Sequence, residues 1–199
     1  MSHLDYTDPK VIASLRRDIE FSAEMRGVML RYRTTWGLFS PREIDAGTRL
    51  LLDHMEVREN DRSLDLGCGY GPIGLTLAKL APKGHAVLVD KDFVAVEYSR
   101  TNARLNGIEN AEALLSNGFS AVQGRRFDLV VTNLPAKSGK ELYYLYLHDA
   151  YAALEPGGRF YAVTITGLRH FMARACEEVF GNYDKVKQGK DYTVALAVR

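Results

Sequence analysis

The chain has 199 residues, of which 46% are hydrophobic and 26% are charged, and its formal net charge is +1. This length is typical of one domain, and this composition excludes a disordered chain. Because the net charge is close to zero, there is no bulk attraction to nucleic acid or to a membrane surface. A nucleic-acid partner would have to bind at a local basic patch.

The sequence predicts a reduced, cytoplasmic protein that holds no metal ion. Its first ten residues, MSHLDYTDPK, are polar and acidic, which is not typical of a secretory signal. No apolar run reaches the roughly 18 residues that a membrane span needs. Cys68 and Cys176 are too few for a disulfide framework. The histidines do not pair with Cys or carboxylate residues at metal-ligand spacing.

The first part of the chain predicts two helices with a strand between them. We expect a helix over residues 9–25 and a strand over residues 28–35, where apolar and polar side chains alternate. Ser40 suits the N-cap of the second helix, Pro41 its first position, and Glu43 the closing residue of a capping box. This helix should extend to about residue 55.

From residue 62 onward, short apolar runs alternate with segments of helical length. The runs are residues 63–66, 85–90, 111–116, 127–133 and 158–165. Such alternation is typical of βαβ units, which form a parallel sheet with helices on both faces. Residues 183–189 and 191–199 have no room between them for a crossover helix, so the last strand should run antiparallel.

A glycine-rich stretch, SLDLGCGYGPIGLTLA (residues 63–78), joins the first of these runs to a helix. A glycine turn in this place lets a ligand approach the backbone, although a plain tight turn has the same composition. Asp90 lies 21 residues after Gly69, at the end of the next strand, where an acid accepts hydrogen bonds from a ribose. The two features together indicate a nucleoside ligand.

Two residues near the turn argue against a dinucleotide. Asp65 places a carboxylate where it would repel a pyrophosphate and attract an ammonium group. Pro72 removes one N–H group from the start of the helix and weakens it as a phosphate site. A nucleoside with a sulfonium and an amino-acid ammonium group, but no phosphate, fits better. That description applies to S-adenosylmethionine.

At LDLGCGYG (residues 64–71) the sequence resembles motif I of the class I S-adenosylmethionine-dependent methyltransferases, and the resemblance covers about residues 37–199. It implies a Rossmann-like α/β fold with a seven-stranded, mostly parallel sheet whose last strand is antiparallel. It also implies a set of cofactor-binding residues, namely Asp65, Gly67, Cys68 and Gly69 at the methionine part, Asp90 and Lys91 at the ribose, and Asn117 and Gly118 at the adenine.

A second stretch, VVTNLPAKSGK (residues 130–140), resembles the Asn-Pro-Pro-aromatic motif of methyltransferases that act on planar amino nitrogens. The lone pair of such an amine is delocalised. The side-chain oxygen of Asn133 and a backbone carbonyl can accept its N–H groups and aim the nitrogen at the methyl donor. Asn133 and Pro135 are therefore the predicted catalytic residues, and Asn133 also borders the predicted cofactor site. The alternative is a simple turn after a strand.

The motif departs from the family pattern in two places. Leu134 replaces the first proline, which is tolerable because that position contributes its carbonyl, and Ala136 replaces the aromatic residue that would stack on a base. The nearby Tyr143, Tyr144 and Tyr146 have a helical spacing that favours core packing over a stacking platform. Trp36, the only tryptophan in the sequence, fits either a core position or a stacking surface near the site, and the sequence does not distinguish the two roles.

The segment GLFSPREIDAGTRLLL (residues 37–52) resembles the small-domain methyltransferases related to bacterial ribosomal RNA guanine-N2 methyltransferases. In that group a Phe-Ser pair and a D-x-G-[ST] segment help to close the cofactor pocket. Here these positions are Phe39, Ser40, Asp45, Gly47 and Thr48. The alternative is an ordinary capped amphipathic helix.

The bacterial enzymes carry a further N-terminal domain. In this chain, residues 1–38 predict only a helix and strand extension before a methyltransferase domain over residues 39–199. Basic residues that could meet RNA phosphates, or that simply form solvated faces, are Arg26, Arg31, Arg33, Arg125, Arg126, Lys137 and Lys140.

These features predict methyl transfer to an exocyclic amino nitrogen, in the first place guanine N2 of ribosomal RNA. Three alternatives remain open. The chain could methylate a protein glutamine or a small-molecule amine, it could be a non-catalytic S-adenosylmethionine-binding module, or it could be a nicotinamide oxidoreductase.

Overall fold

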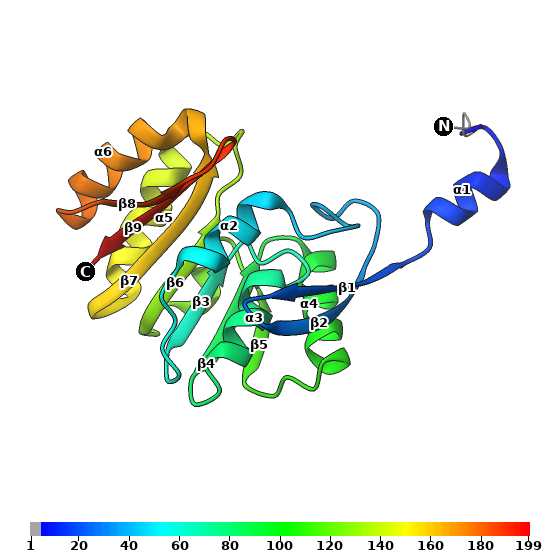
Figure 1. Cartoon of the computed structure of the whole chain (residues 1–199), viewed down its shortest axis with the longest axis horizontal. Coiled ribbons are helices and arrows are strands. Elements are labelled where there is room, and N and C mark those ends of the chain that lie inside the picture. The colour runs from blue at the N-terminus through cyan, green and yellow to red at the C-terminus, as the bar shows by residue number, and fades with distance from the viewer. Residues whose placement is uncertain (1–4) are drawn as a thin grey trace.

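A seven-stranded sheet forms the centre of the computed structural model, which describes residues 5–199 (Figure 1). Its strands are β3 (Arg62–Leu66), β4 (His85–Asp90), β5 (Ala111–Leu115), β6 (Phe127–Asn133), β7 (Leu154–Ile165), β8 (Asp184–Gln188) and β9 (Tyr192–Val198). They lie in the order β5-β4-β3-β6-β7-β9-β8. The apolar runs read from the sequence therefore all become strands of one sheet.

Strands β3 to β7 pair in parallel, and β9 is antiparallel to both of its neighbours, β7 and β8. The predicted direction of the last strand is thus confirmed. The chain order reverses at β3, because the path leads from β3 outward to β4 and β5 and then returns to β6 on the other side of β3. In open sheets of this kind, ligands bind at the carboxyl ends of the strands beside such a switch point.

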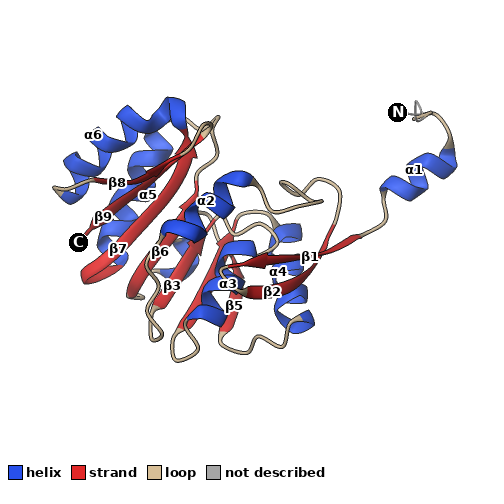
Figure 2. Ribbon diagram, in the orientation of Figure 1, coloured by secondary structure: helices blue, strands red, loops and turns tan. Residues whose placement is uncertain are grey.

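Helices cover both faces of the sheet, as predicted (Figure 2). They are α2 (Ala46–His54), α3 (Pro72–Leu80), α4 (Phe93–Leu105), α5 (Lys140–Ala153) and α6 (Arg169–Phe180), with short 3-10 turns at Ser120–Val122 and Thr166–Leu168. One core cluster joins α2, α3 and α4 to the sheet, for example through Leu52, Leu77 and Val96. The other joins α5 and α6 to the opposite face through residues such as Leu147 and Met172.

The N-terminal segment differs from the sequence prediction. A single helix over residues 9–25 is wrong, because α1 (Pro9–Leu15) ends early and a strand, β1 (Ile19–Met25), follows it. That strand pairs antiparallel with β2 (Val28–Thr34), whose extended conformation was predicted. The turn between them has positive φ at Arg26 and Gly27, the backbone that a two-residue hairpin turn requires.

The β1–β2 hairpin packs on α4, while α1 stands away from the rest of the chain (Figure 1). Asn102 of α4 and Asn106, the C-cap of this helix, each exchange hydrogen bonds with the backbone of β2, at Arg33 and Arg31. Leu30 belongs to the same core cluster as the central helices. The first four residues of the predicted extension over residues 1–38 lie outside the described residues, and the division at residue 38 stays a prediction.

The start of α2 is also different from the prediction. Ser40 is not its N-cap, because the helix begins at Ala46 and its N-cap is Asp45, whose side chain accepts hydrogen bonds from the next turn. Ser40 has a left-handed φ of 45°, and its hydroxyl donates to the carbonyl of Glu43. The expected capping box is therefore a turn that precedes the helix.

None of the helices within residues 5–199 combines the length and the hydropathy that crossing a membrane requires.

Candidate active site

The glycine turn at the carboxyl end of β3 has the backbone that only glycine adopts easily. Gly67, Gly69 and Gly71 have φ values of 78°, 56° and 96°. No atom lies within 4 Å of a Cβ built on Gly67 or Gly69, so the space beside these two residues is open to a ligand. By contrast, a Cβ on Gly74 would lie 2.4 Å from Cγ of Leu88, which shows that this glycine serves helix packing.

Asp90 is bound to the glycine turn at the end of the adjacent strand. Its Oδ2 accepts a 2.9 Å hydrogen bond from the amide of Gly69, and its Oδ1 accepts one of the same length from the amide of Asp92. A carboxylate can accept about four hydrogen bonds. Asp90 therefore keeps capacity for the hydroxyls of a ribose. The adjacent Lys91 is exposed.

Asp65 lies behind the glycine turn and is buried. Its Oδ2 accepts a 2.7 Å hydrogen bond from the amide of Gly74, while its Oδ1 has no hydrogen-bond partner among residues 5–199. Burial, assisted by the charge of Asp90, raises the pKa of Asp65 to about 7. A buried carboxylate in this place favours a cationic ligand group at the turn, and a direct contact with the ligand stays a prediction.

Helix α4 holds the glycine turn from the other side. The hydroxyl of Ser99 donates to the carbonyl of Gly69 at 2.9 Å, and the amide of Asn102 donates to the carbonyl of Tyr70 at the same distance. Sequence reasoning missed both residues, because polar residues inside a helix carry no local sign of such a role. Burial, and then the charge of Asp65, raises the pKa of Cys68, so this buried thiol is not a nucleophile.

The turn after β5 contains the predicted adenine residues. Asn117 is exposed, and the carbonyl of Gly118 accepts a hydrogen bond from Ser116. A Cβ on Gly118 would lie 3.2 Å from the ring of Tyr146 on α5. Tyr146 is partly buried, so that its ring packs against the core cluster of α5 and α6 and also borders this turn. The predicted core position is therefore correct in part for Tyr146.

Two other tyrosines of α5, Tyr143 and Tyr144, have structural roles. Tyr143 is buried, and its hydroxyl donates a 2.6 Å hydrogen bond to the carbonyl of Pro135. Tyr144 is hydrogen-bonded to Glu178. The core interpretation is therefore correct for Tyr143, which also supports the acceptor loop.

Asn133 ends β6, and its side chain faces the start of α2. Its Nδ2 donates to Oδ1 of Asp45 at 3.2 Å and to Oγ1 of Thr48 at 3.1 Å. Its Oδ1 accepts no hydrogen bond from the described part of the chain. The next residue, Leu134, is buried, and its amide donates to the carbonyl of Val163. The strand end is thus fixed while one acceptor of Asn133 stays available.

Two aromatic side chains lie exposed on the loop before α2. Trp36 is 63% exposed and Phe39 is 69% exposed, so Trp36 is not a core residue. The loop is tied to the glycine turn, because the hydroxyl of Tyr70 donates to the carbonyls of Ser40 and Glu43. The role of Phe39 in closing the cofactor pocket stays a prediction.

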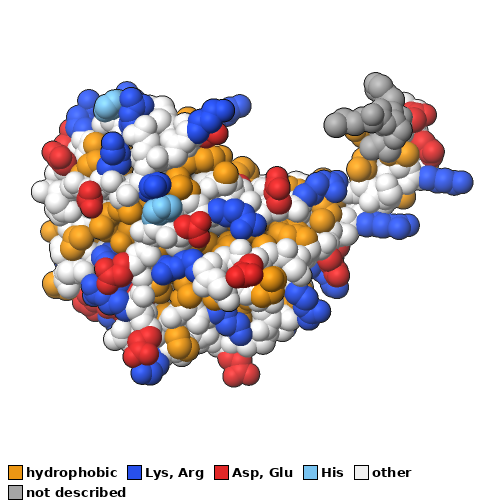
Figure 3. All heavy atoms as spheres, in the orientation of Figure 1, with side chains coloured by type: hydrophobic (Ala, Val, Ile, Leu, Met, Phe, Trp, Pro, Cys, Tyr) orange, Lys and Arg blue, Asp and Glu red, His pale blue; other side chains and the backbone are white. Residues whose placement is uncertain are grey.

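Two of the basic residues considered for RNA binding are engaged in ion pairs. Arg33 pairs with Glu20, and Arg125 pairs with Glu112. Figure 3 shows charged side chains of both signs dispersed over one face of the molecule, without a single basic patch on that face. For these two arginines, a solvated ion pair is the better interpretation.

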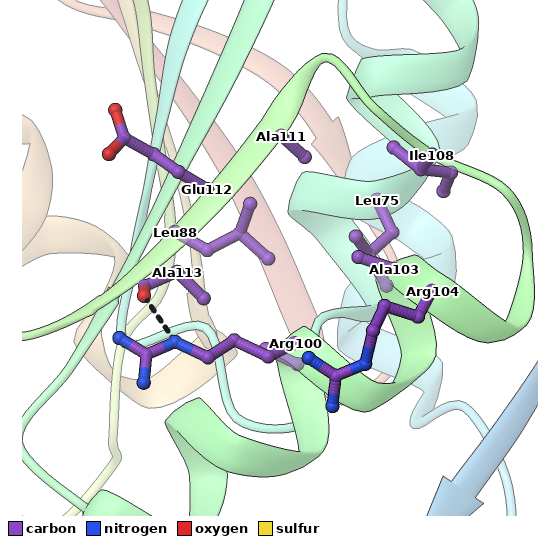
Figure 4. Close-up of a pocket in the computed structure, with 10 residues that line it drawn as sticks. Leu75, Leu88, Arg100, Ala103, Arg104, Ile108, Ala111, Glu112 and Ala113 are labelled. Carbon is purple, nitrogen blue, oxygen red and sulfur yellow. Dashed lines mark hydrogen bonds between the residues drawn. The ribbon is translucent and has the colours of Figure 1, made fainter.

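A cavity of about 270 Å³ lies between α4 and β5 (Figure 4). Apolar side chains such as Leu75 and Ile108 line it together with Arg100, whose Nε donates to the carbonyl of Ala113. Arg100 also pairs with Glu97. None of the predicted site residues lines this cavity, but it is lined by Ser99, which also holds the glycine turn, so it borders the back of that turn.

The residues around the glycine turn fit S-adenosylmethionine. Open space lies beside two glycines, a fixed carboxylate lies at Asp90 for the ribose, and a buried carboxylate lies at Asp65 behind the turn. Within residues 5–199 there is no group of three His, Cys, Asp or Glu side chains that could hold a metal ion.

Comparison with known proteins identifies the family of the chain. The family model described as the methyltransferase small domain matches residues 29–196. The protein YbxB of Bacillus subtilis is 32% identical over 99% of this chain and 98% of its own length. Ribosomal RNA small subunit methyltransferase C of Cronobacter sakazakii is 33% identical over 85% of this chain, but over only 49% of that enzyme.

A solved structure of a ribosomal RNA methyltransferase is also similar to this chain. The T. thermophilus 16S rRNA N2 G1207 methyltransferase, in complex with AdoMet and guanosine, superimposes with a TM-score of 0.82 and 30% identity. The match covers 90% of this chain and 50% of that one. This chain therefore spans about half of the length of the ribosomal RNA methyltransferases that it resembles.

Proposed function

The chain belongs to the methyltransferase small domain family and is an S-adenosylmethionine-dependent methyltransferase, and on this premise we propose that it methylates an exocyclic amino nitrogen, namely N2 of a guanine in ribosomal RNA. The observation that carries this proposal is the hydrogen bonding of the Asn133 side chain. Its amide nitrogen donates hydrogen bonds to Asp45 and Thr48 at the start of α2. Its oxygen is left as a free acceptor at the carboxyl end of β6.

The acceptor geometry suits an aromatic amine. Such a nitrogen is a weak nucleophile, and two acceptors that hold its N–H groups turn its lone pair in one direction. In this chain the two acceptors would be Oδ1 of Asn133 and the carbonyl of Leu134. The amide of Leu134 is bound to Val163, and Tyr143 binds the carbonyl of Pro135, so that the loop is anchored on both sides.

The cofactor residues complete the proposed mechanism. When it is bound, S-adenosylmethionine supplies an electrophilic methyl group on a sulfonium. Asp90 would hold its ribose, the glycine turn would leave room for its methionine part, and the charge of Asp65 would favour its ammonium group. No strong base is required, because an amine becomes acidic once it is methylated and releases its proton to water.

Support for ribosomal RNA comes from the relatives. The enzymes of Cronobacter sakazakii and T. thermophilus are ribosomal RNA methyltransferases by name, and the latter acts on N2 of a guanine. This chain spans about half of each, so its own substrate is part of the proposal.

A second candidate is methylation of a protein glutamine or a small-molecule amine. It is favoured by Ala136, an exposed small residue where the motif of base-specific enzymes has an aromatic one. The exposed Trp36 and Phe39 offer other surfaces for stacking, which is why RNA remains the first proposal.

The test is transfer of a labelled methyl group to total RNA from a strain that lacks this protein, followed by nucleoside analysis. We expect label in N2-methylguanosine. Absence of label in RNA, with S-adenosylhomocysteine binding intact, would contradict the RNA substrate and direct the same assay to protein and small-molecule amines. Label in another nucleoside would contradict guanine N2 alone.

A further inference from the structure

Asp45 contacts both the start of α2 and the predicted catalytic residue Asn133. As the N-cap of the helix, its Oδ1 accepts the amides of Gly47 at 2.9 Å and Thr48 at 3.2 Å. The same carboxylate lies against Nδ2 of Asn133, which is 3.2 Å from Oδ1 and 3.3 Å from Oδ2. The two residues are 88 positions apart in the sequence, so that the fold alone brings them together.

The two ends of an asparagine amide have nearly the same shape and opposite hydrogen-bonding character. A rotation by about 180° exchanges the acceptor oxygen with the NH₂ group, and the surroundings decide which end faces which partner. An ionised carboxylate only accepts hydrogen bonds. The NH₂ group of Asn133 therefore has to face Asp45, and the oxygen has to face away from it.

Resting on the proposed function, we infer that Asp45 is a positioning residue for catalysis: it fixes the orientation of the Asn133 amide so that Oδ1 is presented to the amine of the substrate. Thr48 cannot perform this selection. Its hydroxyl accepts from Nδ2 at 3.1 Å, but a hydroxyl donates equally well to an oxygen in the same place.

The cap makes this selection rigid. Asp45 has an extended backbone, and its Oδ1 is held by the first turn of α2. The carboxylate therefore cannot rotate away without releasing two backbone amides. The start of α2 is in turn tied to the core, because Thr48 and Leu51 are buried. The helix thus presents a fixed acceptor to the end of β6.

The substitution Asp45→Asn isolates the proposed role. Asparagine is as good an N-cap as aspartate, so the helix should keep its stability. Its oxygen would stay on the amides of Gly47 and Thr48, still 3.2 Å from Nδ2 of Asn133, while its NH₂ group would take the place of Oδ2 at 3.3 Å. The new NH₂ group disfavours the NH₂ group of Asn133 beside it and favours its oxygen, so the selection of one orientation of the Asn133 amide is lost. We expect the rate at saturating S-adenosylmethionine and RNA to fall by about tenfold or more.

Measurements of cofactor affinity and thermal stability distinguish the positioning role of Asp45 from a purely structural role. Asp45→Asn should leave the affinity for S-adenosylhomocysteine and the melting temperature close to those of the wild type. The matched control is Asp53→Asn, the same change at an exposed position of the same helix, which should leave the rate unchanged. Asp45→Ser, which also retains a cap, should lower the rate as well, because it removes the carboxylate.

A reciprocal exchange tests the direction of the hydrogen bond. In Asn133→Asp alone, two carboxylates would face each other about 3 Å apart, which is unfavourable. In the double variant Asp45→Asn with Asn133→Asp, the NH₂ group introduced on α2 donates to the carboxylate introduced at the end of β6. The second oxygen of that carboxylate is free to accept the amine. We expect the double variant to be faster than either single variant.

The outcomes distinguish this inference from the proposed function. Full activity of Asp45→Asn beside an inactive Asn133→Ala would overturn the positioning role and leave the function intact. A double variant no faster than the two single ones would overturn the orientation argument. Full activity of Asn133→Ala would instead refute the proposed amine mechanism, and the role of Asp45 with it.

Discussion

The amide of Gly69 donates a 2.9 Å hydrogen bond to Oδ2 of Asp90, and this contact joins the glycine turn to the end of the neighbouring strand. The carboxylate that is suited to a ribose is therefore also a support of the turn that would face the methionine part. The two halves of the predicted cofactor site are therefore coupled through one side chain.

The first prediction concerns Asp90→Ala. The change removes an acceptor for the ribose and the support of Gly69. We expect affinity for S-adenosylhomocysteine to fall by about 10- to 100-fold, since hydrogen bonds to a charged group contribute about 1.5–3 kcal/mol. Titration calorimetry measures this, with Asp53→Ala as the control at an exposed carboxylate. Unchanged affinity would exclude Asp90 from the site.

The second prediction concerns pH and Asp65. Because burial raises its pKa to about 7, the native state without ligand retains a proton that the unfolded state releases near pH 4. The free energy of unfolding should therefore decrease as the pH rises from about 4 to about 7 and then level off. Urea titrations at several pH values measure this, and Asp65→Asn should remove that part of the slope.

The same group gives an opposite trend for ligand binding. A cationic ammonium group at the turn favours the ionised form of Asp65. Affinity for S-adenosylhomocysteine should therefore increase as the pH rises through about 7 in the wild type and stay flat in Asp65→Asn. An equal pH dependence in both proteins would show that another group is responsible.

The third prediction concerns Gly74, the glycine that serves helix packing. In Gly74→Ala, the new methyl group would lie 2.4 Å from Cγ of Leu88, a fully buried residue. Overpacking of this kind costs about 1–3 kcal/mol of stability. Thermal or urea unfolding measures the loss, and the added change Leu88→Ala should cost less in Gly74→Ala than in the wild type. Purely additive losses would contradict the predicted clash.

Local sequence patterns predicted much of the sheet but not the helix starts. The alternation of apolar runs and the glycine turn each depend on neighbouring residues, so the parallel sheet and its reversed last strand could be anticipated. The strand order and the hydrogen bond from Gly69 to Asp90 could not. Residues 19–25 have the period of two that is typical of a strand, and the prediction of one long helix over residues 9–25 does not account for it. Ser40 satisfied a capping pattern that Asp45 satisfies in the structure.

The parts of the site that the sequence does not predict are contacts between distant segments. Asn133 could be named from its motif, but its hydrogen bonds to α2 could not, because nothing near Asn133 in the sequence specifies them. Ser99 and Tyr146 are likewise brought to the site by helices whose sequence pattern reports only their buried face.

The fourth prediction concerns Asn133→Ala. Loss of the acceptor oxygen should reduce the rate of methyl transfer by at least about 100-fold, as for the removal of one polar group that contacts the reacting atoms. Affinity for S-adenosylhomocysteine should stay close to that of the wild type. Asn60→Ala, at an exposed position, serves as the control. A parallel loss of cofactor affinity would assign Asn133 to binding instead of amine orientation.

The fifth prediction concerns the support of the acceptor loop. Tyr143→Phe keeps the buried ring and removes the hydroxyl that donates to the carbonyl of Pro135 at 2.6 Å. Stability should fall by about 1 kcal/mol, the usual contribution of one such hydrogen bond. The loop beside Leu134 would then be less well fixed, so the rate should decrease severalfold at unchanged cofactor affinity.

Tyr144→Phe is the matched control. It makes the same change one residue later, at a hydroxyl bound to Glu178 on α6, away from this loop. Only Tyr143→Phe should slow the reaction, and an equal effect of both variants would show that the loop does not depend on this hydrogen bond.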